Sequence, residues 1–252
     1  GIAAVFVILI IYLGVTSFIF LNDATKTYAQ AKVAYAAVKL QNIELARKEF
    51  ATTKQDIIIL KKDLVPMAFV GYIPFIGGYY NDVKNLVGAS EHGVNAAIIT
   101  ADSLIPYADV LGLKGEKSFA AGSAEDRIKL AVQTLGKVVP QIDTIEAELK
   151  AAQTDVDKVN PNRYPQVWKL KKVHDQLVTL KTLVNGSVVA VEDGKPLIKL
   201  IPDLLGEKEE KKYLVIFQND KELRPTGGFI TFYAIFRVEK GIIKVDKAGD
   251  IY

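Results

Sequence analysis

The spacing of hydrophobic residues changes twice along this chain. Residues 1–21 are continuously apolar, and residues 25–205 then carry apolar side chains mainly at the three- and four-residue intervals of helices. From residue 213 onward, β-branched and aromatic residues dominate, as in strands. The pattern predicts a mainly α chain of the α+β class: a single N-terminal transmembrane helix, helical hairpins or a bundle, and two or three antiparallel strands that continue beyond the chain end.

The first segment, from Gly1 to Leu21, contains no charged side chain. At about 1.5 Å per residue, a helix of this length covers the roughly 30 Å hydrocarbon core of a bilayer. The segment is longer than the apolar part of a cleaved signal peptide, and a buried core helix rarely lacks every charge over such a length. We therefore predict a membrane anchor. Lysines follow the anchor, but they do not fix its orientation because long domains translocate largely regardless of such charges.

Residues 22–111 are predicted to form a membrane-proximal helical region. An alanine-rich helix is expected over residues 25–40 and an amphipathic helix over residues 43–64. Two arrangements are compatible with Gln41 and Asn42 between them. The chain either breaks there, so that the two helices pair, or continues through Asn42 as a long stalk above the membrane.

Residues 65–80, with the sequence VPMAFVGYIPFIGGYY, are strongly apolar and are interrupted by proline and glycine. A continuous helix would not tolerate these interruptions, so we expect a kinked hydrophobic loop followed by a helix from about residue 81. The loop either packs as core beneath the neighbouring helices or enters the membrane surface, where tyrosine and phenylalanine are favoured.

A glycine-rich linker is predicted over residues 112–122, followed by an antiparallel helical hairpin over residues 123–206. Ser123 and Asp126 have the spacing of a capping box, which marks the start of the first hairpin helix. Apolar residues recur along both helices in a stripe wide enough for a bundle core. Gly194 and Pro196 are expected to loosen the second helix before a short final one.

Residues 207–252 are predicted to begin an α/β or β domain. Strands are expected over residues 213–218, 228–238 and 242–246. Because two or three strands are marginally stable alone, the sheet must lie on the helical hairpin or continue into residues beyond 252.

The connection between the first two strands carries the most specific motif, NDKELRPTGGF. In a structural interpretation, Pro225 fixes the backbone, Thr226 bonds the turn backbone, and Gly227 and Gly228 permit a tight turn. Arg224 then holds the turn by pairing with Asp220, Glu222 or backbone carbonyls. This interpretation requires no ligand.

A functional interpretation of the same motif is also open. Backbone N–H groups in a glycine turn form an anion-binding concavity, and an adjacent arginine binds carboxylates or phosphates through two hydrogen bonds. The candidate ligand-binding residues are then Arg224, Thr226, Gly227 and Gly228. If the protein is an enzyme, Asp220 and Glu222 are the candidate acid and base; no catalytic residue is otherwise assigned.

The motif, together with the earlier segment IPFIGGYYNDVKNL, resembles the uncharacterised bacterial envelope proteins of domain-of-unknown-function family 4012. The resemblance implies one N-terminal span, a helical region, and then a domain that begins near the motif and continues past residue 252. It also implies extracytoplasmic placement of everything after the span. The family supplies no established activity.

Composition and charge argue against several kinds of site and partner. The chain has no cysteine, which excludes disulfides and thiolate metal sites, and its 32 basic and 29 acidic residues are mixed along the chain, which disfavours nucleic acid. His92 and His174 lack metal-ligand spacing, so no metal or other cofactor is expected.

We therefore expect a membrane-anchored cell-envelope or surface protein with a structural, binding or assembly role. Its expected partners are the lipid bilayer and an envelope glycan, other envelope proteins or further copies of itself. An envelope enzyme acting on a phosphorylated or glycan substrate, with Arg224 as the anion ligand, is the first alternative. A surface-filament subunit is the second.

Overall fold

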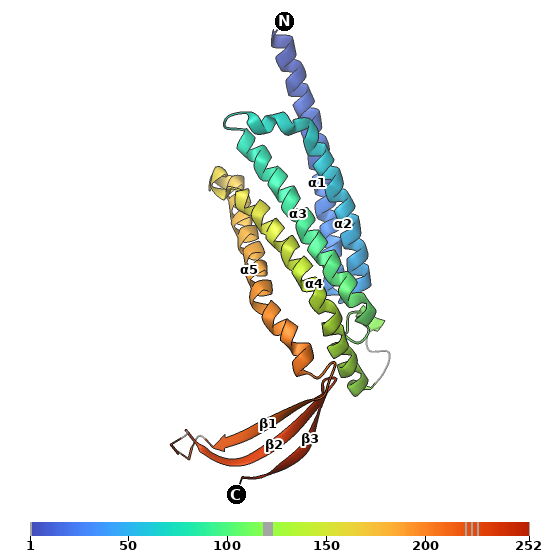
Figure 1. The fold of residues 1–252 in the computed structure, drawn as a ribbon. Coiled ribbons are helices and arrows are strands. Elements are labelled where there is room, and N and C mark those ends of the chain that lie inside the picture. The colour runs from blue at the N-terminus through green and yellow to red at the C-terminus, as the bar shows by residue number, and fades with distance from the viewer. Residues whose placement is uncertain (1, 118–122, 220, 223, 226, 252) are drawn as a thin grey trace.

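The computed structural model describes residues 2–117, 123–219, 221–222, 224–225 and 227–251 and contains five long helices followed by a three-stranded antiparallel sheet (Figure 1). This arrangement confirms the α+β class and the predominance of helix. The elements are α1 (Ile2–Lys39), α2 (Ile43–Leu64), η1 (Val65–Tyr72), α3 (Gly77–Leu104), η2 (Ile105–Tyr107), η3 (Gly115–Lys117), α4 (Ala124–Lys158), η4 (Pro161–Arg163), α5 (Trp168–Leu204), β1 (Lys211–Asn219), β2 (Phe229–Glu239) and β3 (Ile242–Asp250).

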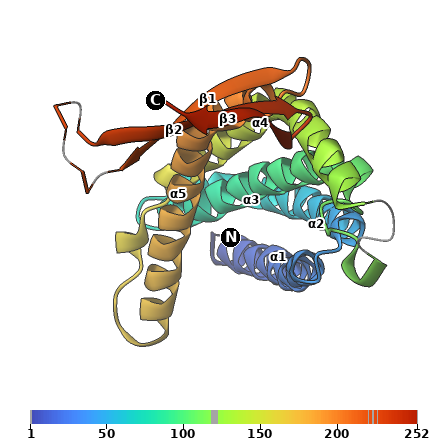
Figure 2. The same ribbon diagram turned by 90° about the horizontal axis from the view of Figure 1, so that it is seen from below.

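The long helices pack in chain order, each against the next. Viewed from below, they form an arc with α1 at one end and α5 at the other (Figure 2). Because α3 and α4 pack along each other, the residues before and after the predicted linker share one helical layer. The arc has a convex and a concave side, and its concave side faces the space between α1 and α5.

Helix α1 is one continuous rod that includes both the predicted span and the alanine-rich segment after it. The chain reverses at Gln41, which has a φ of +52°, and Asn42 caps α2 by accepting the N–H of Leu45 at 3.0 Å. Fully buried Ala34 and Ala46 provide small side chains between the paired helices. The predicted break and pairing are therefore confirmed, and the long-stalk alternative is wrong.

Residues 65–76, here called the apolar bend, connect α2 to α3. The predicted irregular loop is wrong for its first part, because Val65–Tyr72 form a 3₁₀ helix, and α3 begins at Gly77, earlier than predicted. The bend folds so tightly that a Cβ atom on Gly77 would lie 2.3 Å from the carbonyl oxygen of Gly71. Glycine therefore allows α3 to start at Gly77. The positions of proline and glycine in the sequence did not by themselves predict this start.

Helices α4 and α5 form the predicted antiparallel hairpin. Ser123 and Asp126 form the predicted capping box. The predicted interruption near Gly194 and Pro196 is wrong, because α5 continues through both residues to Leu204. A proline inside a helix costs about 3 kcal/mol. In this helix, ion pairs that join Lys195 to Asp143 and Glu146 hold the same stretch against α4.

A buried ion pair joins the start of α3 to the turn between α4 and α5. The carboxylate of Asp82, whose side chain is 1% exposed, pairs with Arg163 and accepts the N–H of Asn160 at 3.2 Å. Arg163 also donates to the carbonyl oxygen of Gly78 at 2.9 Å. Burial, and secondarily the charge of Asp82, raise the pKa of the neighbouring Tyr164 to about 12. The cluster fixes one end of the hairpin to the preceding helices.

A second acidic group lies between α1 and α2. Asp63 near the end of α2 faces Asp23 of α1, which pairs with Lys26 at 2.8 Å. Burial is the main cause that raises the pKa of Asp63, and the charge of Asp23 and a hydrogen bond with it raise the pKa further. One carboxyl oxygen of Asp63 is buried without a hydrogen-bond partner. Ionised Asp63 therefore destabilises this helix pair.

The three strands lie in the order β1-β2-β3 beyond the lower end of the bundle (Figure 1). Two backbone hydrogen bonds attach the sheet to the end of α5: Lys240 N–H to the carbonyl oxygen of Gly206 at 2.9 Å, and Gly241 N–H to that of Leu205 at 2.7 Å. The hydroxyl of Tyr213 in β1 also donates to the carbonyl oxygen of Leu204, at 2.6 Å. Gly241 also lies against Val132 of α4. The sheet thus meets the end of the hairpin and does not cover its side. The strands carry exposed apolar side chains at Leu214, Ile216, Phe217, Ile243 and Val245.

We predict that Asp82→Ala destabilises the protein by about 3 kcal/mol, because the substitution leaves Arg163 without its buried partner. Thermal unfolding of the full chain in detergent measures the effect. The matched control is Asp102→Ala on the same helix, which removes the half-exposed pair with Arg47 and should cost no more than about 1 kcal/mol. Equal losses in the two variants would contradict a special role for Asp82.

Asp63→Asn should stabilise the protein at pH 7 by about 1 kcal/mol, because it removes a buried charge beside Asp23. The raised pKa means that the folded state binds this proton more tightly than the unfolded state does, so the free energy of unfolding falls as the pH rises from the unfolded pKa through the folded pKa. The advantage of the variant should therefore shrink as the pH is lowered toward 4. Thermal unfolding at several pH values measures this, with Asp56→Asn as control; an advantage that grows in acid would refute the explanation.

Candidate functional site

The sequence motif lies at the tip of the β1–β2 hairpin, far from the helices (Figure 1). Arg224 pairs with Glu222 at 2.8 Å, and both side chains are about half exposed. The Arg224 guanidinium also lies 4.8 Å from the centre of the Phe229 ring. Asp220 and Thr226 lie outside the described residues. The structure therefore brings Arg224 together with Glu222, as the structural interpretation of the motif predicts.

The two glycines of the motif have distinct backbone roles. Gly227 has a φ of +113°, a value that side chains strongly disfavour. Gly228 is buried, and a Cβ atom there would lie 2.4 Å from the carbonyl oxygen of Asn219. The side-chain amide of Gln218 donates to the carbonyl oxygen of Gly228 at 3.1 Å. These contacts explain both glycines through the turn itself, and anion binding at the motif stays a prediction.

A second candidate site lies on the concave side of the helical arc. It is an apolar groove of about 550 Å³, here called the concave groove, to which all five long helices contribute side chains. This volume lies within the usual range of small-molecule sites. Its walls include Tyr28, Phe50, Leu149, Leu180, Leu183 and Val184.

The serine and threonine hydroxyls that line the concave groove are already hydrogen-bonded within their own helices. Thr27, Thr53, Ser90 and Ser187 each donate to the carbonyl oxygen four residues earlier, at 2.8 Å in every case. These side chains therefore turn their polar atoms toward their own backbone. The groove presents an apolar surface that suits a hydrocarbon chain better than a polar ligand.

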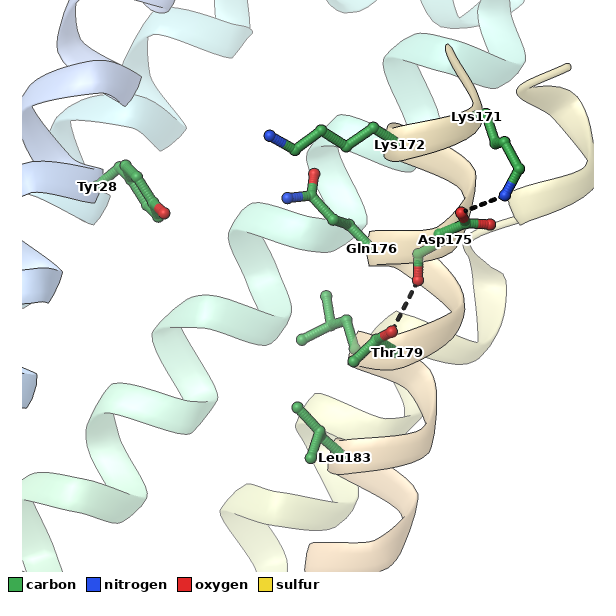
Figure 3. A pocket seen from close by; sticks show the side chains of 8 residues that line it. Tyr28, Lys171, Lys172, Asp175, Gln176, Thr179 and Leu183 are labelled. Carbon is green, nitrogen blue, oxygen red and sulfur yellow. Dashed lines mark hydrogen bonds and ion pairs between the residues drawn. The ribbon is translucent and has the colours of Figure 1, made fainter. Parts of the chain in front are cut away.

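A second, more open pocket adjoins the concave groove, shares Tyr28, Leu180 and Leu183 with it, and is here called its mouth. Polar side chains gather there, and Tyr28 of α1 faces Lys172 and Gln176 of α5 (Figure 3). Lys171 pairs with Asp175 at 3.0 Å. Hydrogen bonds from Lys171, and secondarily from the adjacent histidine, lower the pKa of Asp175. Lys172, in contrast, forms no ion pair with any residue that the structure describes. A positive charge therefore lies beside an apolar interior.

The groove is close to the predicted membrane segment. Tyr28 follows Leu21 by seven residues, which corresponds to roughly 10 Å along a helix. An apolar cavity with a cationic mouth can bind one hydrocarbon chain that carries an anionic head group. The arrangement favours binding over catalysis, because the side chains that line the interior are aliphatic, aromatic or hydrogen-bonded within their own helices.

The sequence prediction did not identify this groove. Leu180 and Val184 belong to the stripe that was expected to form the hairpin core, and both do pack against buried Ala89, Ala152 and Val156. They also line the groove. Leu183, which is 63% exposed, lies beside this stripe and widens it. A widened apolar stripe is the one signal of a groove in the sequence. A broad stripe that is fully buried would give the same signal, so the sequence does not distinguish the two.

The two histidines lie on separate helices. His92 of α3 lies 2.6 Å from Glu148 of α4, and His174 of α5 lies 3.2 Å from Asp175. Within the described ranges, no group of three or more histidine, aspartate or glutamate residues is arranged to hold a metal ion. The His92–Glu148 contact joins two helices of the bundle.

The model of the family described as "Protein of unknown function (DUF4012)" matches residues 208–251. Comparison with curated proteins and with solved structures gives no match. The matched residues comprise all three strands and the three residues before β1. The resemblance of the earlier segment IPFIGGYYNDVKNL lies outside the match and stays a prediction. Over its three-stranded sheet, the chain therefore resembles the DUF4012 family.

Proposed function

We propose that this chain is a membrane-anchored cell-envelope protein with a binding role. Helix α1 anchors it in the bilayer, and the concave groove binds the hydrocarbon chain of an anionic amphiphile. The observation that carries the proposal is the apolar groove with Lys172 at its mouth. Such a site takes its ligand from the membrane to which the protein is anchored.

The exposed surface of α1 supports the membrane anchor. By length and composition, α1 qualifies as a membrane-crossing helix, and it is the one helix in the described part of the chain that does so. Ile8, Ile10 and Phe18 are among its many exposed apolar side chains. Its N-terminal turns extend beyond the rest of the bundle (Figure 1). A continuous apolar surface of this kind is unfavourable in water and favourable in lipid.

The chemistry of the groove supports an amphiphile as its ligand. A hydrocarbon chain fits the aliphatic walls, and burial of apolar surface contributes about 25 cal/mol per Å². The anionic head group would remain at the mouth, where Lys172 has no competing carboxylate partner among the described residues. The two ends of the ligand thus meet the two chemically different parts of the site.

Placement in the envelope, outside the cytoplasm, stays a prediction from the sequence resemblance, because the matched family is described only as one of unknown function. Envelope-glycan binding and self-association stay predictions. The enzyme alternative needs Arg224 to bind a substrate anion, whereas Arg224 already has Glu222 as its partner. The filament alternative also stays a prediction.

We predict that Leu183→Asp weakens binding of cis-parinaric acid, a fluorescent fatty acid, by at least about tenfold, or ~1.4 kcal/mol. The substitution introduces a charge on the apolar wall, and Leu183 is exposed enough that the fold should persist. Fluorescence titration of the full chain in detergent measures the affinity. Val189→Asp is the matched control, since Val189 lies on the same helix, is 51% exposed and does not line the groove. An equal loss in both variants would place the ligand elsewhere.

Lys172→Glu should weaken binding of the same fatty acid by about fivefold, equivalent to the ~1 kcal/mol of a good exposed ion pair. Binding of its neutral methyl ester should not change, because the ester has no negative charge. Lys244→Glu on β3 serves as the charge-matched control. If the acid and the ester lose affinity equally, Lys172 does not recognise the head group.

A further inference from the structure

The apolar bend exposes large hydrophobic side chains that no other element covers. Tyr72 is 90% exposed and Phe75 is 97% exposed, whereas only Met67 among the apolar side chains of the bend is buried. No charged residue occurs between residues 65 and 81. A surface that is apolar, aromatic and uncharged over this length is typical of contact with lipid or with another protein.

Contacts with α1 place the bend beside the predicted membrane segment. The hydroxyl of Tyr12 donates to the carbonyl oxygen of Pro66 at 3.2 Å, and the hydroxyl of Ser17 donates to the sulfur of Met67 at 3.6 Å. Tyr12 and Ser17 both precede Leu21, the last residue of the apolar segment. Along a helix they lie roughly 6–14 Å from that residue, on the side toward the bilayer. If residues 1–21 occupy the bilayer, the bend must enter it as well.

The backbone of the bend is suited to this position. Residues 65–72 are helical, and after them Ile73 N–H donates to the carbonyl oxygen of Val70 at 3.0 Å and Gly77 N–H to that of Ile73 at 2.8 Å. The side-chain amide of Asn81 reaches the carbonyl oxygen of Gly71 at 3.4 Å. These bonds reduce the number of polar backbone groups that lipid would leave without a partner.

Phe75 shows the least favourable local geometry of the bend for a protein in water. Its φ of +67° is a value that non-glycine residues rarely adopt, and its ring is almost fully exposed. No protein contact within the described residues offsets both features. Transfer of the ring from water into lipid is favourable and would offset the unfavourable backbone at this position.

We infer that the apolar bend inserts into the same bilayer that α1 enters and forms a second membrane contact beside the anchor. The bilayer is the expected occupant because the bend is continuous with the apolar surface of α1, to which Tyr12 and Ser17 attach it. The inference rests on the proposed anchoring of α1. Two contacts with one bilayer would also limit the tilt of the bundle above it.

Tryptophan fluorescence in lipid nanodiscs tests the inference with the full chain. Trp168, the single tryptophan, is first removed by Trp168→Phe. One new tryptophan is then introduced into this variant by Phe75→Trp, Val7→Trp or Val189→Trp. Nanodiscs that contain bromine-labelled phosphatidylcholine quench tryptophans in contact with lipid. We expect Phe75→Trp to be quenched several-fold more strongly than Val189→Trp and to emit at shorter wavelength.

The outcomes separate the bend from the anchor. Quenching at both Phe75→Trp and Val7→Trp supports insertion of both elements. Quenching at Val7→Trp without quenching at Phe75→Trp overturns the inference and leaves the anchor intact, and an absence of quenching at both positions overturns the anchor too.

A second readout uses the absence of cysteine in the chain. Tyr72→Cys should react several-fold more slowly with a membrane-impermeant maleimide in nanodiscs than Val189→Cys does. Equal reaction rates would show that the bend is exposed to water and would overturn the inference. This result is expected if the bend binds a soluble protein instead.

Discussion

Helix α1 combines two different surfaces in one rigid element, and the positions of the apolar bend and of the concave groove both depend on it. Its apolar first part is exposed, whereas its later part packs against α2 through buried alanines. Because the helix is uninterrupted, the distance between these two parts is fixed at about 1.5 Å per residue. The position of the apolar bend along α1 and the distance of Tyr28 from Leu21 are therefore both set by the same helix.

The positions of the remaining helices depend on ion pairs between neighbours, because the arc of helices does not close into a bundle. In a closed bundle each helix has two neighbours, but α1 and α5 form the ends of this arc (Figure 2). The buried pair of Asp82 and Arg163 fixes the α4–α5 turn to α3, and the Lys195 ion pairs hold α5 to α4. Together these contacts maintain the position of α5 and thereby the width of the concave groove.

Local signals in the sequence predicted local structure well. The capping box at Ser123 and the three strands were predictable, because each depends on residues within one or two turns or on strand composition. The chain reversal at Asn42 was one of two arrangements that the sequence left open. The continuity of α5 through Pro196 was not predictable, since it depends on packing against α4. The concave groove was missed for a related reason: an apolar stripe has the same spacing whether a neighbouring helix covers it fully or only in part. At the sequence motif, the Arg224–Glu222 pair agrees with the structural interpretation, while ligand binding there stays a prediction.

The attachment of the sheet to α5 has a mechanical consequence. The hydrogen bonds from Lys240 and Gly241 to the end of α5 join helix and sheet directly, with only a short turn at Gly206 between them. The same helix forms one wall of the concave groove. A sideways displacement of α5 at the groove would therefore move the tip of the β1–β2 hairpin over a larger distance than α5 itself moves. If the groove binds a ligand as proposed, its occupancy would then be coupled to the position of the sheet, which the DUF4012 family model matches.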